Sequence, residues 1–185
     1  MVERAELTGT LSRDALYVAI GRLEGSPAGQ QQSLLLVDID CFKQYNDVFG
    51  NDAGDLVLQK LAGLLQHTVP SSCEIGRLGG DEFLVFLPRT AIAAAQVVAE
   101  TIRELFACSA DAGGLTLTVG VATTPADRQW ECQQLVELAD LRTVVAKKRL
   151  QPGRNCTWAG DLPDGWQGAR FFQWPTSGTY PSSAR

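Results

Sequence analysis

The chain has 185 residues, of which 45% are hydrophobic and 20% charged, and its formal net charge is −5. This length suits one domain and is too short for two ordinary ones. The acidic balance disfavours a nucleic-acid partner, because duplex binding depends on clustered Lys and Arg that release counterions. A single nucleotide needs only a few local cations, so it stays allowed. No apolar run reaches the roughly eighteen residues that could span a membrane.

The N-terminus and the cysteines indicate a compartment. The first residues lack the basic start, apolar stretch and cleavage site of a signal peptide, so we expect a cytoplasmic protein with no membrane segment. The chain has one histidine and five cysteines without a C-x-x-C pair, a pattern that does not favour a zinc site. We interpret the cysteines as small apolar core residues in a reducing compartment, at Cys41, Cys73, Cys108, Cys132 and Cys156.

Hydrophobic periodicity predicts the elements in the first half of the chain. Apolar residues at helical spacing predict a helix over 11–24. The apolar run "SLLLVDID" over 33–40 predicts a central strand that ends in two acids. A short helix is expected over 41–49. An amphipathic helix follows over 52–69 and ends before a proline.

The second half predicts a hairpin, two helices and two further strands. The expected elements are strands near 73–78 and 82–87, a helix over 90–109 capped by Thr90, a strand over 113–123, a helix over 131–150 and a strand over 155–160. This order predicts an α/β or α+β class, one sheet covered by helices. Residues 161–185 are rich in Pro, Gly, Ser and aromatics. We therefore expect one domain over 1–160 and a tail over 161–185. Aromatic residues this dense are usually buried, so we favour a tail that packs on the domain, with a partner chain as the alternative.

The hairpin carries two glycines and two acids in the stretch "RLGGDEF". Gly79 and Gly80 first suggest a tight turn, because type I′ turns need φ > 0 at both central positions. On this interpretation Asp81 and Glu82 only solvate the turn. A functional interpretation depends on what lies beside the hairpin.

Two acids end the predicted central strand. Asp38 and Asp40 follow a run that reads as buried, and buried carboxylates are costly unless they are paired or bound to metal. If the hairpin pairs beside this strand, Asp38 and Asp81 converge at one edge of the sheet. Two such oxygen ligands suit Mg²⁺ completed by substrate phosphates. The alternative is that the two acids cap the following short helix.

Backbone amides and two cations are placed to bind those phosphates. The backbone of Cys41, Phe42 and Lys43 opens the short helix after the strand, and a helix N-terminus presents free N–H groups to anions. Lys147 ends the last helix and Arg154 follows it, so both could neutralise the same phosphates. Taken alone, Lys147 is more often a solvated surface residue.

Five blocks of this sequence together resemble one family: "DIDCFKQYND", "AGDLVL", "RLGGDEF", "LTVGVA" and "AD…AK…GRN". In this order they resemble the GGDEF domain of diguanylate cyclases, over roughly residues 7–158. The resemblance implies a nucleotide-cyclase, ferredoxin-like fold with a central, mostly antiparallel sheet surrounded by helices. It also implies an enzyme, a nucleotidyltransferase that condenses two GTP into cyclic di-GMP and releases pyrophosphate. Such an enzyme would act as a face-to-face homodimer with Mg²⁺, or with Mn²⁺.

The resemblance also implies roles for individual residues. Asp38, Asp81 and the carbonyl of Ile39 would bind the metal, and Glu82 would join the two aspartates as a catalytic acid that accepts a proton near the attacking 3′-hydroxyl. A carboxylate at Asp55 would accept hydrogen bonds from guanine donors that adenine lacks. The residues that would bind the substrate are Cys41, Phe42, Lys43, Asn46, Asp55, Gly79, Gly80, Lys147 and Arg154.

The chain departs from the family pattern at several positions, and two of these departures bear on function. Where the family often has an inhibitory Arg-x-x-Asp product site, residues 70–73 read Pro-Ser-Ser-Cys, so we expect no feedback inhibition there. In the last helix, residues 142–144 read Arg-Thr-Val in place of Ala-Leu-Tyr, and three extra residues precede Gly153. Lys147 is therefore a firmer phosphate ligand than Arg154. These changes leave a second hypothesis open, a degenerate domain that binds GTP and regulates a partner. We expect any input signal to come from an upstream region or a separate protein.

Overall fold

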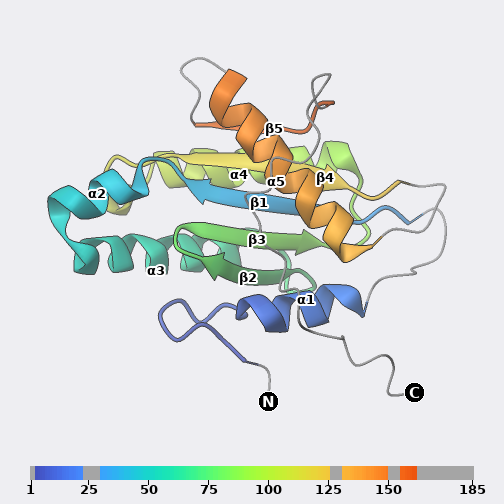
Figure 1. Ribbon diagram of the computed structural model, residues 1–185, viewed down its shortest axis with the longest axis horizontal. Coiled ribbons are helices and arrows are strands. Elements are labelled where there is room, and N and C mark those ends of the chain that lie inside the picture. The colour runs from blue at the N-terminus through green and yellow to red at the C-terminus, as the bar shows by residue number, and fades with distance from the viewer. Residues whose placement is uncertain (1–2, 23–29, 126–130, 150–154, 162–185) are drawn as a thin grey trace.

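A single sheet forms the middle of the molecule, with helices on both of its faces (Figure 1). The structure, a computed structural model, describes residues 3–22, 30–125, 131–149 and 155–161. In chain order the elements are α1 (Arg13–Gly21), β1 (Ser33–Ile39), α2 (Phe42–Phe49), α3 (Asn51–Thr68), β2 (Glu74–Gly79), β3 (Glu82–Leu87), α4 (Ile92–Ala107), the 3₁₀ turn η1 (Ala110–Ala112), β4 (Leu117–Thr123), α5 (Cys132–Arg149) and β5 (Cys156–Trp158). The predicted α+β class is confirmed. Within the described ranges, no helix has the length and apolar character of a membrane span.

The strand order in the sheet is β2-β3-β1-β4-β5. β1 pairs antiparallel with β3 and β4, β2 pairs antiparallel with β3, and β5 runs parallel to β4. The sheet is therefore mostly antiparallel, as expected, and β1 lies at its centre with every residue buried. In register, Asp38 lies opposite Glu82 of β3 and Thr118 of β4. The end of β1 is thus the place where the hairpin and β4 meet.

Alternation along β1 divides the core into two layers. Val37 and Ile39 pack with α3 and α4, whereas Leu34 and Leu36 pack with α1 and α5. Because successive side chains of a strand point to opposite faces, Asp38 lies on the face that α1 and α5 cover. The period of the strand therefore directs this acid toward α5.

The two glycines do not form the centre of the hairpin turn. β2 continues to Gly79, which pairs with Glu82, so Gly80 and Asp81 occupy the two central positions. Only the first of these has a positive φ, 54° at Gly80, which is the type II′ pattern and not the type I′ pattern. A register shift between Arg77 and Gly79 supplies the extra residue. Asp81 therefore lies at the tip of the turn.

One smaller expectation was wrong and another holds only in part. Thr90 does not cap α4, because its hydroxyl donates to the Pro88 carbonyl at 3.0 Å and the helix begins only at Ile92. The left-handed backbone of Arg89, with φ of 51°, turns the chain before the helix starts. The five cysteines are free thiols, but only Cys132 is buried and Cys108 is exposed. Cys132 therefore lies in the core, Cys41 and Cys73 pack against its edge, and the expectation is clearly wrong only for Cys108.

Candidate active site

Charged side chains gather where β1, the β2–β3 hairpin and α5 meet. Lys147 of α5 pairs with Asp38, its Nζ lying 2.5 Å from Oδ1. Glu82 lies opposite Asp38 in the antiparallel register. The hairpin tip adjoins the end of β1, because the Ile39 N–H donates to the Asp81 carbonyl at 3.4 Å. The structure thus brings together the three acids and the lysine that the sequence singled out.

Burial raises the pKa of three carboxyl groups in this cluster. The pKa of Asp38 rises to about 6, because burial outweighs the favourable charge of Lys147 and Asp81 adds repulsion. Burial, followed by the charges of Asp38 and Asp81, raises the pKa of Glu82 to about 7. The pKa of Asp140 rises to about 6 through burial, which Lys147 partly offsets. A carboxyl group with a pKa near 7 is suited to accept a proton at neutral pH.

The oxygen atoms at the end of β1 suit a hard divalent cation. Asp38 and Asp81 offer carboxylates and Ile39 offers a carbonyl, the ligand types that Mg²⁺ prefers. The Lys147 ammonium already neutralises Asp38, so this position accepts a positive charge. In the part of the chain that the structure describes, no group of three His, Cys, Asp or Glu side chains could hold a metal. Substrate phosphates and water would therefore have to complete the coordination.

Helix α2 begins beside these acids without a side-chain cap. Its N-cap residue, Cys41, has φ of 61°, and the Cys41 side chain makes no capping hydrogen bond to the helix. The preceding residue is fixed, because the Asp40 N–H donates to the Thr116 carbonyl at 2.8 Å. Uncapped amides and the helix dipole favour an anion at this end. The start of α2, including Phe42 and Lys43, is thus placed for phosphate binding.

Asp40 has a structural role and does not join the charged cluster. Its carboxylate accepts hydrogen bonds from the hydroxyls of Thr116 and Thr118, each at 2.7 Å, and from the Asn155 N–H at 2.9 Å. The residue is 2% exposed. The alternative that it caps α2 was wrong, because the segments around β4 and β5 occupy both of its oxygens. Asp38 does not cap the helix either.

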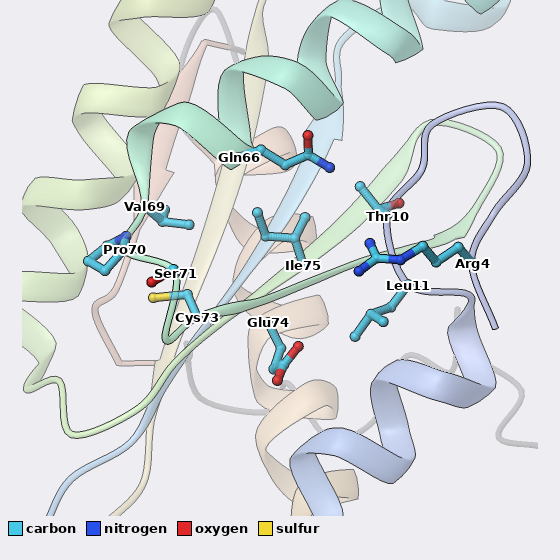
Figure 2. Close-up of a pocket in the computed structure, with 10 residues that line it drawn as sticks. All are labelled: Arg4, Thr10, Leu11, Gln66, Val69, Pro70, Ser71, Cys73, Glu74 and Ile75. Carbon is cyan, nitrogen blue, oxygen red and sulfur yellow. The ribbon is translucent and has the colours of Figure 1, made fainter. Parts of the chain in front are cut away.

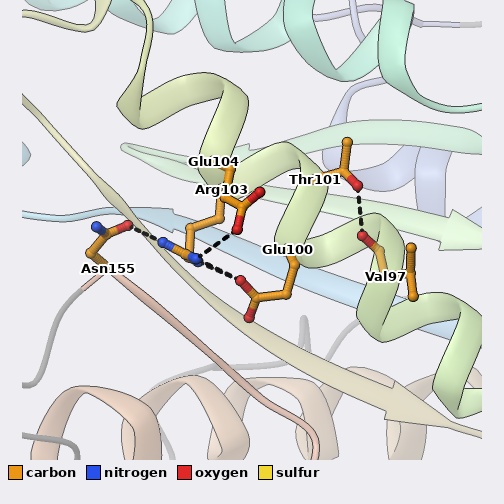
Figure 3. A network of polar contacts seen from close by, with 6 residues as sticks. All are labelled: Val97, Glu100, Thr101, Arg103, Glu104 and Asn155. Carbon is orange, nitrogen blue, oxygen red and sulfur yellow. Dashed lines mark hydrogen bonds and ion pairs between the residues drawn. The ribbon is translucent and has the colours of Figure 1, made fainter.

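Asn155 links Asp40 to α4 through a polar network (Figure 3). Its Oδ1 accepts from Arg103 Nη1 at 2.8 Å, and its φ of 54° is one that asparagine tolerates. Arg103 also pairs with Glu100 at 2.7 Å. This network fixes the chain immediately after the expected phosphate ligand Arg154. Arg154 itself, with Gly153 and the tail from residue 162, lies outside the described residues.

The altered part of α5 docks directly on β4. Arg142 Nη1 donates to the Val121 carbonyl at 2.6 Å. Thr143 lies against Gly120, where a Cβ would lie 2.7 Å from the Thr143 backbone nitrogen. Only glycine permits this close approach of helix and strand. Two residues that depart from the family pattern therefore contact β4 in the helix that carries Lys147 to the end of β1.

The expected guanine ligands lie on adjoining helices. Asn46 of α2 contacts Gly54 of α3, since a Cβ at Gly54 would lie 2.8 Å from Asn46 Cγ. The Asn46 Oδ1 is buried and has no hydrogen-bond partner among the described residues. Asp55, the next residue of α3, is exposed. Both candidate ligands are therefore at the junction of α2 and α3.

Sequence reasoning assigned no role to Asp140, which the structure adds to the cluster. Asp140 is 7% exposed. The charge of Asp140 helps to raise the pKa of Glu82. Burial raises the pKa of Asp140 itself, and the charge of Lys147 lowers it in part. It precedes Lys147 by seven residues, about two helical turns, so the two side chains share one face of α5. That spacing was the signal available in the sequence.

A cavity of about 220 Å³ lies away from the cluster, between the end of α3, the start of β2 and the N-terminal segment (Figure 2). Pro70 and Cys73, which stand where the family's inhibitory motif would be, line it. The charged residues in its lining are Arg4 and Glu74. Arg4 Nη1 donates to the Gly9 carbonyl at 2.6 Å. The absence of feedback inhibition through that motif stays a prediction.

Known proteins match both the sequence and the fold. The family described as "Diguanylate cyclase, GGDEF domain" matches residues 6–154. Diguanylate cyclase DgcM of Escherichia coli (strain K12) is 38% identical over 120 residues, which cover 63% of this chain and 29% of that protein. Diguanylate cyclase SiaD from Pseudomonas aeruginosa, solved with its activator SiaC, has a TM-score of 0.73 and 32% identity over 83% of this chain and 60% of that one. The GGDEF domain of DgcB from Caulobacter crescentus, solved in complex with c-di-GMP, has a TM-score of 0.71 and 26% identity over 85% of this chain and 95% of that one.

The family match covers most of the chain and includes all five sequence blocks except the final residue of the last one. The chain spans 29% to 33% of the length of the curated relatives it matches. The structural neighbours share the same fold, with β1 and the hairpin side by side at its centre in this chain. The resemblance expected from the sequence is thus confirmed, and the chain belongs to the diguanylate cyclase GGDEF domain family.

Proposed function

We propose that the chain is a diguanylate cyclase that condenses two GTP into cyclic di-GMP and releases two pyrophosphates. The observation that carries the proposal is the cluster at the end of β1. Asp38 and Glu82 lie opposite each other there, and α5 supplies Lys147 to Asp38. These residues provide a cation for phosphate, a proton acceptor and oxygen ligands for a metal within one small region.

Mg²⁺ fits the oxygen atoms of this region, and Mn²⁺ takes similar ligands. Asp38, Asp81 and the carbonyl of Ile39 would hold the ion, which would neutralise phosphate charge and favour departure of pyrophosphate. Lys147 would then be available to the triphosphate, together with the amides that open α2. The other proposed phosphate ligands are Lys43 and Arg154, and Gly79 and Gly80 leave open space beside the hairpin for the nucleotide.

Glu82 is the proposed proton acceptor. Its pKa of about 7 keeps much of it deprotonated at neutral pH while leaving it basic enough to accept a proton. Its carboxylate takes the proton of the attacking 3′-hydroxyl as the new O3′–P bond forms and the bond to pyrophosphate breaks. Burial is the main reason that this carboxyl is basic, and the charges of Asp38, Asp81 and Asp140 add to it.

Two copies must meet in this mechanism, because each domain binds one GTP and the product contains two nucleotides. Turnover per molecule should therefore rise with protein concentration. Input would come from a region outside this chain or from a separate protein, as SiaC is an activator of SiaD. The rival function, a GTP-binding regulatory domain without turnover, rests on the altered last helix. The docking of Arg142 on β4 and the pairing of Lys147 with Asp38 favour the enzyme.

Purified protein incubated with GTP and Mg²⁺ tests the proposal. We expect cyclic di-GMP and pyrophosphate, measured by anion-exchange chromatography, and no product after EDTA or in Asp81→Ala. The rate per molecule should increase when the protein is concentrated. GTP that binds but is never consumed at high protein concentration would contradict the enzyme and support the regulatory domain.

A further inference from the structure

The carboxamide of Asn46 packs against α3 at Gly54, a residue without a side chain. A Cβ at Gly54 would lie 2.8 Å from Asn46 Cγ and 3.1 Å from Nδ2, and closer still to Oδ1. The oxygen therefore occupies the volume that any larger residue would fill. The backbone of Gly54 does not require glycine, because its φ is outside the left-handed region. Since glycine is unfavourable inside a helix, the contact with Asn46 is the physical reason for its presence.

The contact between Gly54 and the Asn46 carboxamide determines which atom of the amide, oxygen or nitrogen, faces a ligand. The Asn46 Oδ1 is buried, and no described residue donates an N–H or O–H to it. It faces the Gly54 backbone, whose Cα–H is a weak donor. In the opposite orientation both amide hydrogens would point at carbon and lose their partners. The amide nitrogen is thus left as a donor for a ligand, and Asp55, the exposed residue that follows Gly54, carries a carboxylate that only accepts.

We propose that Gly54 is a specificity-determining positioning residue that presents Asn46 as a donor beside the acceptor Asp55. Guanine offers the O6 acceptor next to the N1–H donor, whereas adenine offers an amino donor next to a ring-nitrogen acceptor. A fixed donor–acceptor pair therefore matches guanine and mismatches adenine. This inference rests on the proposed function, because it concerns the base of the same substrate. It adds a residue that selects the purine through Asn46.

Gly54→Ala tests the inference, and Gly63→Ala is its matched control. Both glycines lie in α3, but a Cβ at Gly63 would meet nothing within 4 Å. The probes are the α,β-methylene analogues of GTP and ATP, which cannot undergo the reaction, titrated calorimetrically with Mg²⁺. We expect wild type and Gly63→Ala to prefer the guanine analogue by the same ratio of Kd values. Gly54→Ala should reduce that ratio by about tenfold or more and leave the Kd of the adenine analogue nearly unchanged.

A double-mutant cycle separates this role from a general packing effect. Asn46→Ala removes the amide, so a Cβ at Gly54 has room and the double variant should fold even if Gly54→Ala alone does not. We expect Asn46→Ala and Asn46→Ala/Gly54→Ala to show the same reduced preference for guanine, because Gly54 acts only through Asn46. A further loss of preference in the double variant would overturn the inference.

The outcomes distinguish the two proposals. A wild-type chain with no preference for the guanine analogue would contradict the proposed function and this inference together. A wild-type chain that prefers guanine, together with Gly54→Ala as selective as Gly63→Ala, would overturn the inference alone and leave the proposed function standing.

Discussion

Two carboxylates at the end of β1, only two residues apart, have opposite surroundings. Asp40 accepts hydrogen bonds from two threonine hydroxyls and from the Asn155 N–H. Asp38 pairs with the ammonium of Lys147, and burial raises its pKa to about 6. Both are largely buried, at 2% and 7% exposure, so burial does not distinguish them. The kind of partner distinguishes them. Neutral hydroxyl and amide donors bind Asp40, whereas Asp38 pairs with a cation, Lys147, that a phosphate group could attract.

Asp38→Asn should give the largest effect and would sharpen this contrast. The substitution keeps the shape of the side chain and removes a proposed metal ligand, so we expect turnover to fall by about 10³-fold or more. The Tm should change little, because the Lys147 side chain is 35% exposed and water can solvate the ammonium that loses its partner. Cyclic di-GMP production and thermal unfolding measure the two effects. Retained turnover would contradict the proposal that Asp38 is a metal ligand.

Asp40→Ala should act on stability instead. The change leaves the Thr116 and Thr118 hydroxyls and the Asn155 N–H without their acceptor, so we expect the free energy of unfolding to fall by about 3 kcal/mol. The Tm should fall by roughly 10 °C. Asp47→Ala, at an exposed position of α2, is the control and should leave the Tm within a degree or two. Equal Tm values for the two variants would end the structural assignment of Asp40.

Lys147→Met should weaken GTP binding more than it affects the chemical step. It removes a cation from the phosphate region, and we expect KM for GTP to rise by about 10-fold to 100-fold. The pKa of Asp38 should also rise further, because Lys147 lowers it in the wild type. Lys148→Met changes the net charge equally at an exposed position and is the control. If both variants raise KM alike, the effect belongs to overall charge and not to Lys147.

Turnover and stability should change with pH in opposite directions because of Glu82. As a base, Glu82 must be deprotonated, so turnover should rise as the pH passes through about 7. Its pKa is raised from 4.5 to about 7 in the folded chain, so the folded state binds more protons between these values. The contribution of Glu82 to the free energy of unfolding is therefore fully present below pH 4.5, and it is lost as the pH rises toward 7. Tm values at several pH values should show a smaller decline in Glu82→Gln, and an identical decline would contradict the assignment.

Arg142→Met should have the smallest effect. It removes one hydrogen bond from α5 to the Val121 carbonyl and keeps most of the apolar stem, so we expect a loss of about 1 kcal/mol. KM for GTP should rise only slightly, because Thr143 against Gly120 still holds the helix. Thermal unfolding and GTP kinetics measure these effects. An increase in stability would mean that Arg142 does not fix α5.

Sequence reasoning succeeded where a signal is local or repeated. The apolar run before Asp38 predicts a buried central strand, and β1 is buried along its whole length. Alternation and turn residues predict the hairpin, whose strands β2 and β3 begin and end within a residue or so of the expected ranges. These elements carry Asp38 and Glu82, but the two acids meet only because β1 pairs with β3, a contact that no local signal predicts.

The expectations that were wrong or absent depend on contacts between distant segments. Asp40 receives its donors from residues 76 to 115 positions away, so its structural role has no local signature. The bulge that moves the turn to Gly80 and Asp81 depends on strand pairing. Gly54 reads as an ordinary helix glycine until Asn46, on another helix, is seen against it. Tertiary contacts decide each of these features.

The hydrogen bond from Arg142 ends on a main-chain oxygen, the carbonyl of Val121. The side chain at position 121 is buried among other apolar residues and does not contribute to that bond. Position 121 could therefore change during evolution with no compensating change at position 142. Methods that infer contacts from covarying columns of an alignment would not detect this hydrogen bond, although it holds α5, the helix that carries Lys147, against β4.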